Sequence, residues 1–121
     1  MLLNHTNHPS SAWPPEQLKA AREQFGEIVD EPFPSIDPEW DEEAVVALVK
    51  EKVEEFIAKY GKEITVHIMG EATYCFAFVS EMTRRGVACV ASTTVREVSF
   101  EDGIKKSRFR FKRFRYYLFE E

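Results

Sequence analysis

The feature that most constrains the fold of this chain is the alternation of short apolar runs with longer segments of helical periodicity. The strand-like runs are residues 1–4, 27–33, 64–69 and 87–91, and the helix-like segments are residues 16–25, 41–60 and 71–85. Such alternation predicts right-handed crossovers and a parallel sheet. We therefore expect an α/β fold: a three-layer, Rossmann-like, mostly parallel sheet with helices on both faces.

The C-terminal third of the chain follows a different pattern. Residues 101–103 (EDG) are a turn signal, so the chain is expected to return as an antiparallel hairpin strand over residues 105–119. The aromatic side chains of that strand change phase near residues 112–113, which predicts a β-bulge or a bend there.

A chain of 121 residues is long enough for one domain and short for two, so we assign one domain to residues 1–121. The chain is 44% hydrophobic and 31% charged, as is usual for a globular protein. Its net charge of −5 argues against a surface that coats long nucleic acid, although basic side chains crowd the C-terminal strand. That strand either binds nucleic acid or forms an amphipathic edge whose charges prevent edge-to-edge pairing, and the second interpretation is favoured.

The two cysteines lie in apolar runs without spaced histidines. We therefore expect neither a disulfide framework nor a metal site, and we predict no cofactor. The N-terminal sequence lacks the features of a signal peptide, and no window is long enough to span a bilayer. These observations predict a cytoplasmic protein without a membrane partner.

Three polar loops are expected to meet at one edge of the sheet. If the first strand lies beside the third, a switch-point crevice forms between them, where ligands bind in open α/β folds. Residues 5–11, 70–73 and 92–94 all follow predicted strands and would converge there. Because the sequence contains neither the G-x-G-x-x-G fingerprint nor a phosphate-binding P-loop, NAD dependence and ATP hydrolysis lose support.

Each candidate residue at this rim has a functional and a structural interpretation. Gly70 either lets backbone N–H groups approach an anion or makes a plain β–α turn with Glu71 at the helix start, and the second is favoured. Imidazoles in the first loop act as general acid/base groups or belong to a solvated loop. Arg96 binds phosphate or lies on a solvated strand face. His67, inside a strand, is interpreted as a packed core histidine.

The rim segments resemble those of a known family. They are NHTNHPSS (residues 4–11), VHIMGE (66–71) and VASTT (90–94) with Arg96. They resemble small stand-alone CRISPR-associated proteins that share the Rossmann-like core of CARF domains. Several of those are ring nucleases that bind and cleave cyclic oligoadenylate messengers of type III CRISPR systems. The resemblance implies a homodimer that binds cyclic oligoadenylate, expected to be cyclic tetra-adenylate, across its two-fold axis. It also implies metal-independent cleavage, in which a ribose 2′-hydroxyl attacks the adjacent phosphate.

Carried onto this chain, the resemblance gives three catalytic candidates: His5 or His8 acts on the proton, and Arg96 stabilises the phosphate. It assigns ligand binding to Asn7, Ser10, Ser11, Gly70, Glu71, Thr73, Ser92, Thr93 and Thr94. Glu71 is a departure, because a phosphate cradle usually has a hydroxyl or a lysine there, so we expect this corner to contact ribose or base. Two alternatives stay open: a module that binds the nucleotide without cleaving it, and an interaction protein that uses the basic C-terminal strand.

Overall fold

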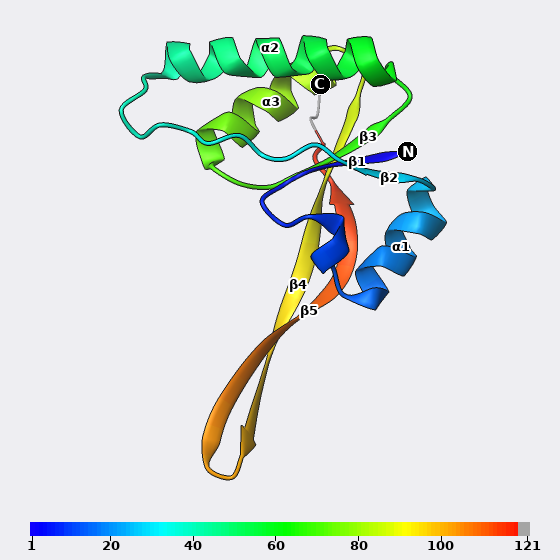
Figure 1. Cartoon of the computed structure of the whole chain (residues 1–121), viewed down its shortest axis with the longest axis vertical. Helices are drawn as coiled ribbons and strands as arrows, with labels where there is room; N and C mark the ends of the chain where they lie inside the picture. The colour runs from blue at the N-terminus through cyan, green and yellow to red at the C-terminus, as the bar shows by residue number, and fades with distance from the viewer. Residues whose placement is uncertain (119–121) are drawn as a thin grey trace.

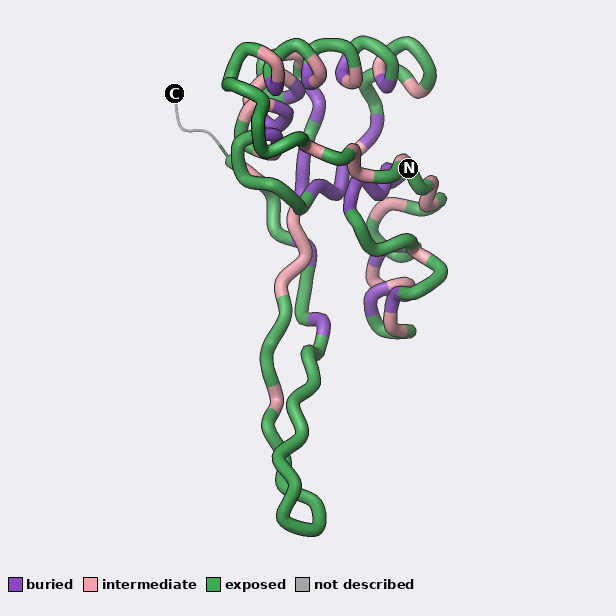
Figure 2. The backbone as a smooth tube through the Cα atoms, turned by 60° about the vertical axis from the view of Figure 1, so that its left-hand side comes forward, coloured by how far each residue is buried: buried purple, intermediate pink, exposed green. Residues whose placement is uncertain are grey.

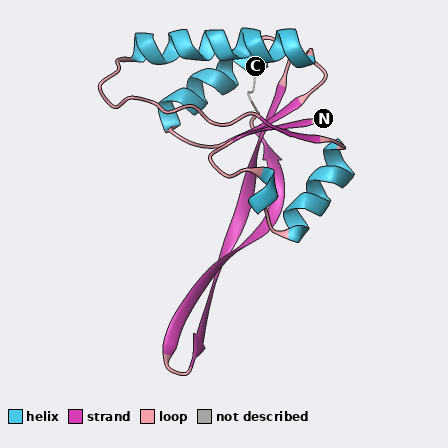
Figure 3. Cartoon of the chain, in the orientation of Figure 1, coloured by secondary structure: helices cyan, strands magenta, loops and turns pink. Residues whose placement is uncertain are grey.

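The computed structural model describes residues 1–118 and contains one five-stranded sheet and three α-helices (Figures 1 and 3). The elements are β1 (Leu2–His5), the short 3₁₀ helix η1 (Ser10–Ala12), α1 (Pro15–Phe25), β2 (Ile28–Asp30), α2 (Glu42–Tyr60), β3 (Thr65–Ile68), α3 (Ala72–Arg84), β4 (Ala88–Glu101) and β5 (Ile104–Tyr116). The strand order is β2-β1-β3-β4-β5, with β5 antiparallel to β4 and the other pairs parallel. The predicted fold class is therefore confirmed. Of the predicted last strand, Phe119 lies outside the described residues.

The sheet is covered on both faces. α2 and α3 cover one face, in a core that includes Leu3, Val49, Phe56, Val66 and Phe78. α1 covers the other, in a core of Leu2, Trp13, Ala21, Val90, Phe111 and Phe114. Successive residues of a strand point to opposite faces, so neighbours in β1 contribute to different cores. None of the helices within residues 1–118 has the length and apolar character needed to cross a bilayer.

β2 is shorter than the sequence predicts. It ends at Asp30 rather than Phe33, and Pro32, which has no N–H to donate to a strand ladder, follows closely. The long helix, by contrast, begins where expected. Asp41 accepts a hydrogen bond from the backbone N–H of Ala44 at 2.9 Å, which caps α2.

β4 and β5 form a hairpin that projects far beyond the rest of the domain (Figures 1 and 2). Asp102 and Gly103, at its tip, both have positive φ, as a two-residue type I′ turn requires. The predicted bulge is present: Thr93 pairs with Arg113 and Thr94 with Phe111, which leaves Lys112 as the extra residue. We call residues 95–110 the hairpin arm.

Candidate functional site

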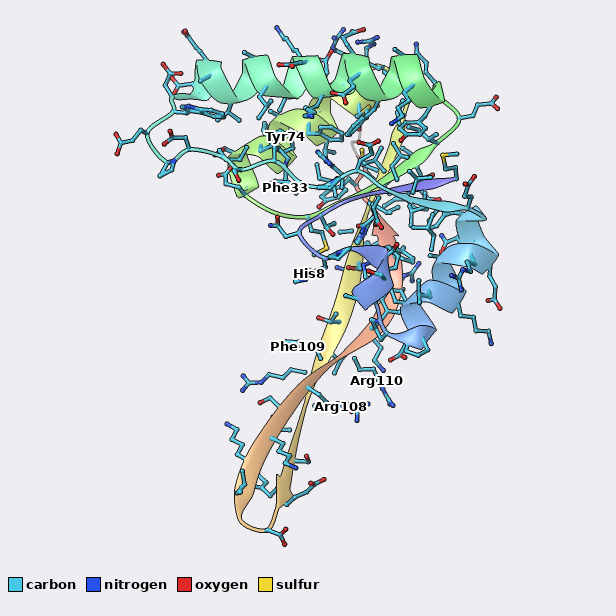
Figure 4. The ribbon with its side chains drawn as sticks, viewed as in Figure 1. His8, Phe33, Tyr74, Arg108, Phe109 and Arg110 are labelled. Carbon is cyan, nitrogen blue, oxygen red and sulfur yellow. The ribbon has the colours of Figure 1, made fainter. Side chains whose placement is uncertain are left out.

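A cleft lies at the edge of the sheet where β1 and β3 end, on the face that α1 covers. Its volume is about 510 Å³. The loop after β1, the start of α1, the end of β3 and the base of the hairpin all line it. Figure 4 shows His8 in the loop after β1 and Phe109 below it on the hairpin. Because the chain crosses over β1 between β2 and β3, this is the predicted switch-point crevice.

A chain of hydrogen bonds runs along the floor of the cleft. The strand register places Asn4 beside His67, and Oδ1 of Asn4 lies 3.0 Å from Nδ1 of His67. On the other side of the imidazole, Nε2 lies 3.1 Å from Oγ of Ser92. Asn4 also donates from Nδ2 to a carboxylate oxygen of Asp30 at 2.8 Å. Each of the four parallel strands therefore contributes one residue.

The hydrogen-bond partners define the tautomer of His67. Nδ2 of Asn4 donates to Asp30 and to the carbonyl of His8, so Oδ1 of Asn4 is an acceptor. Nδ1 of His67 must then carry the hydrogen, which leaves Nε2 free to accept from the Ser92 hydroxyl. That hydroxyl also lies 3.2 Å from the sulfur of Met69, which is a weaker acceptor.

Burial keeps His67 neutral. Its side chain is 2% exposed, and desolvation lowers its pKa to about 4. A hydroxyl bonded to a neutral imidazole, which is in turn oriented by a third group, is the arrangement that activates a hydroxyl in nucleophilic catalysis. The cleft floor can therefore accept a proton through Ser92.

Asp30 anchors the other end of the hydrogen-bonded chain. Besides the Asn4 amide, it accepts the backbone N–H of Ser10 at 3.0 Å and the Ser10 hydroxyl at 2.9 Å. Burial acts to raise the pKa of Asp30, but the hydrogen bonds from Asn4 and Ser10 outweigh burial and hold that pKa below its usual value. The charged carboxylate fixes the Asn4 amide so that its oxygen faces His67.

His5 lies on the opposite face of the sheet from the cleft. It is fully buried against Phe56 and Phe78, beneath α2 and α3. Its Nε2 is 2.8 Å from the Tyr74 hydroxyl and its Nδ1 is 2.6 Å from the Glu31 carbonyl, while burial lowers its pKa. The sheet separates His5 from any ligand in the cleft. The geometry therefore gives His5 a packing role rather than the catalytic role that the resemblance implied.

The corner after β3 serves packing and helix capping. A Cβ atom on Gly70 would lie 2.5 to 2.8 Å from three ring atoms of Phe33, which itself packs against Tyr74 at the start of α3 (Figure 4). The Glu71 carboxylate accepts hydrogen bonds from the backbone N–H groups of Thr73 and Tyr74. A carboxylate therefore already occupies the positive end of α3.

Five of the predicted ligand-binding and catalytic residues line the cleft together: Asn7, His8, Gly70, Ser92 and Thr94. Among the described residues, Ser10, Ser11, Glu71, Thr73 and Thr93 are not part of its lining. Ser10 is held by Asp30, and Thr93 donates from its hydroxyl to the Arg113 carbonyl at 3.2 Å. The predicted rim thus forms, with fewer members than expected.

Arg96 lies on the hairpin arm, two residues beyond Thr94, which lines the cleft. Its Nε and Nη2 donate to the Ser107 hydroxyl at 3.3 and 2.9 Å. It pairs across the hairpin with Phe109, which lines the cleft. Arg96 therefore shares a face of the arm with Phe109, and its guanidinium is held by Ser107, on the side toward the tip of the arm.

Sequence reasoning missed the position of His67 in the cleft. The side chain is buried, as predicted, yet it also lines the cleft. Asn4, Asp30, Trp13 and Phe109 had no individual role in the sequence-based site. A signal was present: polar residues interrupt three apolar strands near their carboxyl ends. Only the register between strands could show that these residues meet.

The comparisons with known proteins give one match. A family model described as "Uncharacterized protein MJ1673 family" matches residues 1–115. Neither the curated proteins nor the solved structures gave a match. The matched span includes every residue of the cleft and of the hydrogen-bonded chain. Among residues 1–118, no group of three or more His, Cys, Asp or Glu side chains is arranged to hold a metal ion.

Proposed function

We propose that this chain, which belongs to the uncharacterized MJ1673 family, binds cyclic oligoadenylate in its cleft and opens the ring by attack of a ribose 2′-hydroxyl. The observation that carries the chemistry is the hydrogen-bonded chain from Asp30 through Asn4 and His67 to Ser92 on the cleft floor. The choice of cyclic tetra-adenylate as the ligand rests on the resemblance to CRISPR-associated ring nucleases. The family description names no substrate, so the resemblance alone supports this choice.

The cleft floor removes the proton of the attacking 2′-hydroxyl. Ser92 Oγ accepts the proton of the 2′-hydroxyl while the Ser92 hydroxyl proton passes to Nε2 of His67. The imidazolium that forms still donates its Nδ1–H to Oδ1 of Asn4. His67, with a pKa near 4, is a weak base at neutral pH. The phosphodiester anion of a bound ligand opposes this, because a nearby negative charge raises the pKa of an imidazole.

The leaving oxygen also needs a proton. As the 2′-oxygen bonds to phosphorus, the bond from phosphorus to the 5′-oxygen breaks. His8, at the exposed rim of the cleft, donates a proton from its imidazole to that 5′-oxygen. The product is a linear oligoadenylate with a 2′,3′-cyclic phosphate at one end and a 5′-hydroxyl at the other.

Aromatic and cationic groups at the cleft suit a nucleotide. Phe109 lines it with a ring that is 69% exposed and on which a base can stack. Arg96, which pairs across the hairpin with Phe109, suits a phosphate, because a guanidinium donates two parallel N–H groups.

The test is turnover of cyclic tetra-adenylate by purified protein, with and without a metal chelator. His67→Gln and Ser92→Ala should each reduce the rate by about 10²-fold or more, the usual contribution of acid–base groups. His8→Ala should reduce the rate as well. Ser99→Ala, on the outer side of the hairpin arm, removes a comparable hydroxyl and should leave the rate unchanged. An intact ring after prolonged incubation with excess protein contradicts catalysis. Saturable binding by calorimetry without products then selects the binding-module alternative.

The same geometry favours a second candidate, in which Ser92 itself attacks phosphorus. Its Oγ bonds to phosphorus as the bond from phosphorus to the 5′-oxygen breaks, His67 takes the hydroxyl proton and the 5′-oxygen leaves as a hydroxyl. Water then hydrolyses the bond from Ser92 to phosphorus and releases the linear product. Oγ of Ser92 lies at hydrogen-bond distance from Nε2 of His67, the spacing of a nucleophile and its base. A ring whose riboses lack 2′-hydroxyls separates the two mechanisms. Cleavage of that ring requires Ser92 attack, whereas 2′-hydroxyl attack leaves it intact.

A further inference from the structure

The hairpin arm has no covering element within the described chain. Every residue of the arm except Glu97 is exposed (Figure 2). Five large apolar side chains of the arm are 45% to 73% exposed: Val95, Val98, Phe100, Ile104 and Phe109. A two-stranded ribbon alone is marginally stable in water, and exposed apolar patches mark binding surfaces. The arm therefore has the character of a surface that binds another molecule.

The strand register divides the charges of the arm between its two faces. Residues paired across the hairpin point to the same side, so Arg96, Val98 and Phe100 share a face with Phe109, Ser107 and Lys105. We call this the inner face, because Phe109 also lines the cleft. Within the described arm, its charged residues are Arg96 and Lys105, both cationic.

The outer face has a different composition. Glu97 forms an ion pair with Arg110 at 3.4 Å, and Glu101 forms one with Lys106 at 2.8 Å. Both glutamates of the arm therefore lie on the outer face, where they neutralise cations. The inner face keeps two phenylalanines and two cations without a carboxylate beside them. Aromatic rings interleaved with cations are the groups that bind single-stranded nucleic acid.

We propose that the inner face of the arm binds single-stranded oligoadenylate and extends the cleft. This inference rests on the proposed function, since it takes the ligand of the cleft to be an oligoadenylate. A base stacks on Phe109 at the cleft rim and a later base on Phe100, while Arg96 and Lys105 contact the phosphates between them. Phe109 lies four positions along β5 from Lys105, the partner of Phe100, so the face adds about 14 Å to the cleft.

Charge favours an oligonucleotide over a second copy of the chain on this surface. β5 carries seven lysine and arginine residues between positions 105 and 115. Pairing of two β5 edges would place like charges opposite one another, which destabilises strand pairs. A polyanionic strand meets the same cations with complementary charge.

The test measures binding of fluorescently labelled linear oligoadenylate RNAs of four and ten nucleotides by anisotropy. The longer RNA should bind the wild-type protein more tightly. Phe100→Ala should weaken binding of the ten-nucleotide RNA about fivefold or more, the loss expected for one stacked base, and affect the four-nucleotide RNA less. Ile104→Ala removes a large apolar side chain from the outer face, 61% exposed against 73% for Phe100, and should bind both RNAs as the wild type does.

A second pair of variants tests the charge. Lys105→Ala should reduce the slope of log affinity against log salt by about 0.7, the value for one phosphate contact on a single strand. Lys106→Ala, whose lysine pairs with Glu101, should leave the slope unchanged. Equal effects of the inner-face and outer-face variants overturn the inference. So does sedimentation showing a wild-type dimer that Phe100→Ala dissociates, because a second copy then occupies the face.

The two proposals fail in different ways. If RNA binding depends on Phe100 and Lys105 but no ring is cleaved, the arm binds nucleic acid and the cleavage chemistry is refuted. If His67→Gln abolishes cleavage while the arm variants bind both RNAs as the wild type does, the chemistry stands and the arm inference is refuted.

Discussion

Burial of a neutral His67 predicts a specific loss of stability in acid. The side chain has a pKa of about 4 in the folded protein and about 6.5 in the unfolded chain. Between these values the unfolded chain binds a proton that the folded protein does not, so stability falls as pH falls through this window. From pH 7.5 to pH 5, two-state linkage gives a loss of about 2 kcal/mol from this residue alone.

Urea denaturation at a series of pH values measures the effect, with His67→Gln as the perturbation. Glutamine does not titrate, so the wild type should lose about 2 kcal/mol more than the variant between pH 7.5 and pH 5. Other groups titrate in both proteins and cancel in the comparison. Ser92→Ala is the control, because it removes the hydrogen-bonded partner of His67 but leaves the imidazole buried. The pH dependence of its stability should match that of the wild type. Parallel pH dependences of wild type and His67→Gln would refute the assignment of His67 as a buried neutral base.

Three further substitutions test the parts of the fold that support the cleft, each by chemical denaturation. Gly70→Ala should destabilise the protein by about 1 to 3 kcal/mol, because the new methyl group displaces the Phe33 ring; an unchanged midpoint would contradict this. Tyr74→Phe leaves the buried Nε2 of His5 without its donor and should cost about 1 to 3 kcal/mol. Asp41→Ala removes the N-cap of α2 and should lower the free energy of unfolding by about 1 kcal/mol. Asp41→Asn keeps a capping oxygen and should lower it much less.

Local sequence patterns predicted the fold well where the positions of buried side chains or of turn residues determine the local structure. The opposite phases of Phe111 and Phe114 predicted the bulge that turns both rings into the core beside α1. The Asp102-Gly103 pair predicted the tip of the hairpin, because both positions need positive φ. The projection of the arm was not predictable in this way, since strand periodicity does not tell which elements will cover a strand.

The site depended on information that a local pattern does not carry. His67 meets Asn4, which lies 63 positions earlier in the chain, only because β1 and β3 are neighbours in a particular register. His5, one residue beyond Asn4, points to the opposite core because side chains alternate along a strand. Sequence reasoning located the cleft by topology, and could not decide which histidine faced it.

The most direct test of the central claim is the chemical form of the first product made from cyclic tetra-adenylate. Attack by a ribose 2′-hydroxyl is an isomerisation, so the opened ring should have the mass of the substrate and end in a 2′,3′-cyclic phosphate. Mass spectrometry of early time points, after chromatographic separation from the intact ring, should show this species with wild-type protein and not with His67→Gln. A first product that already carries the mass of an added water, or a ring that stays intact, would contradict the account.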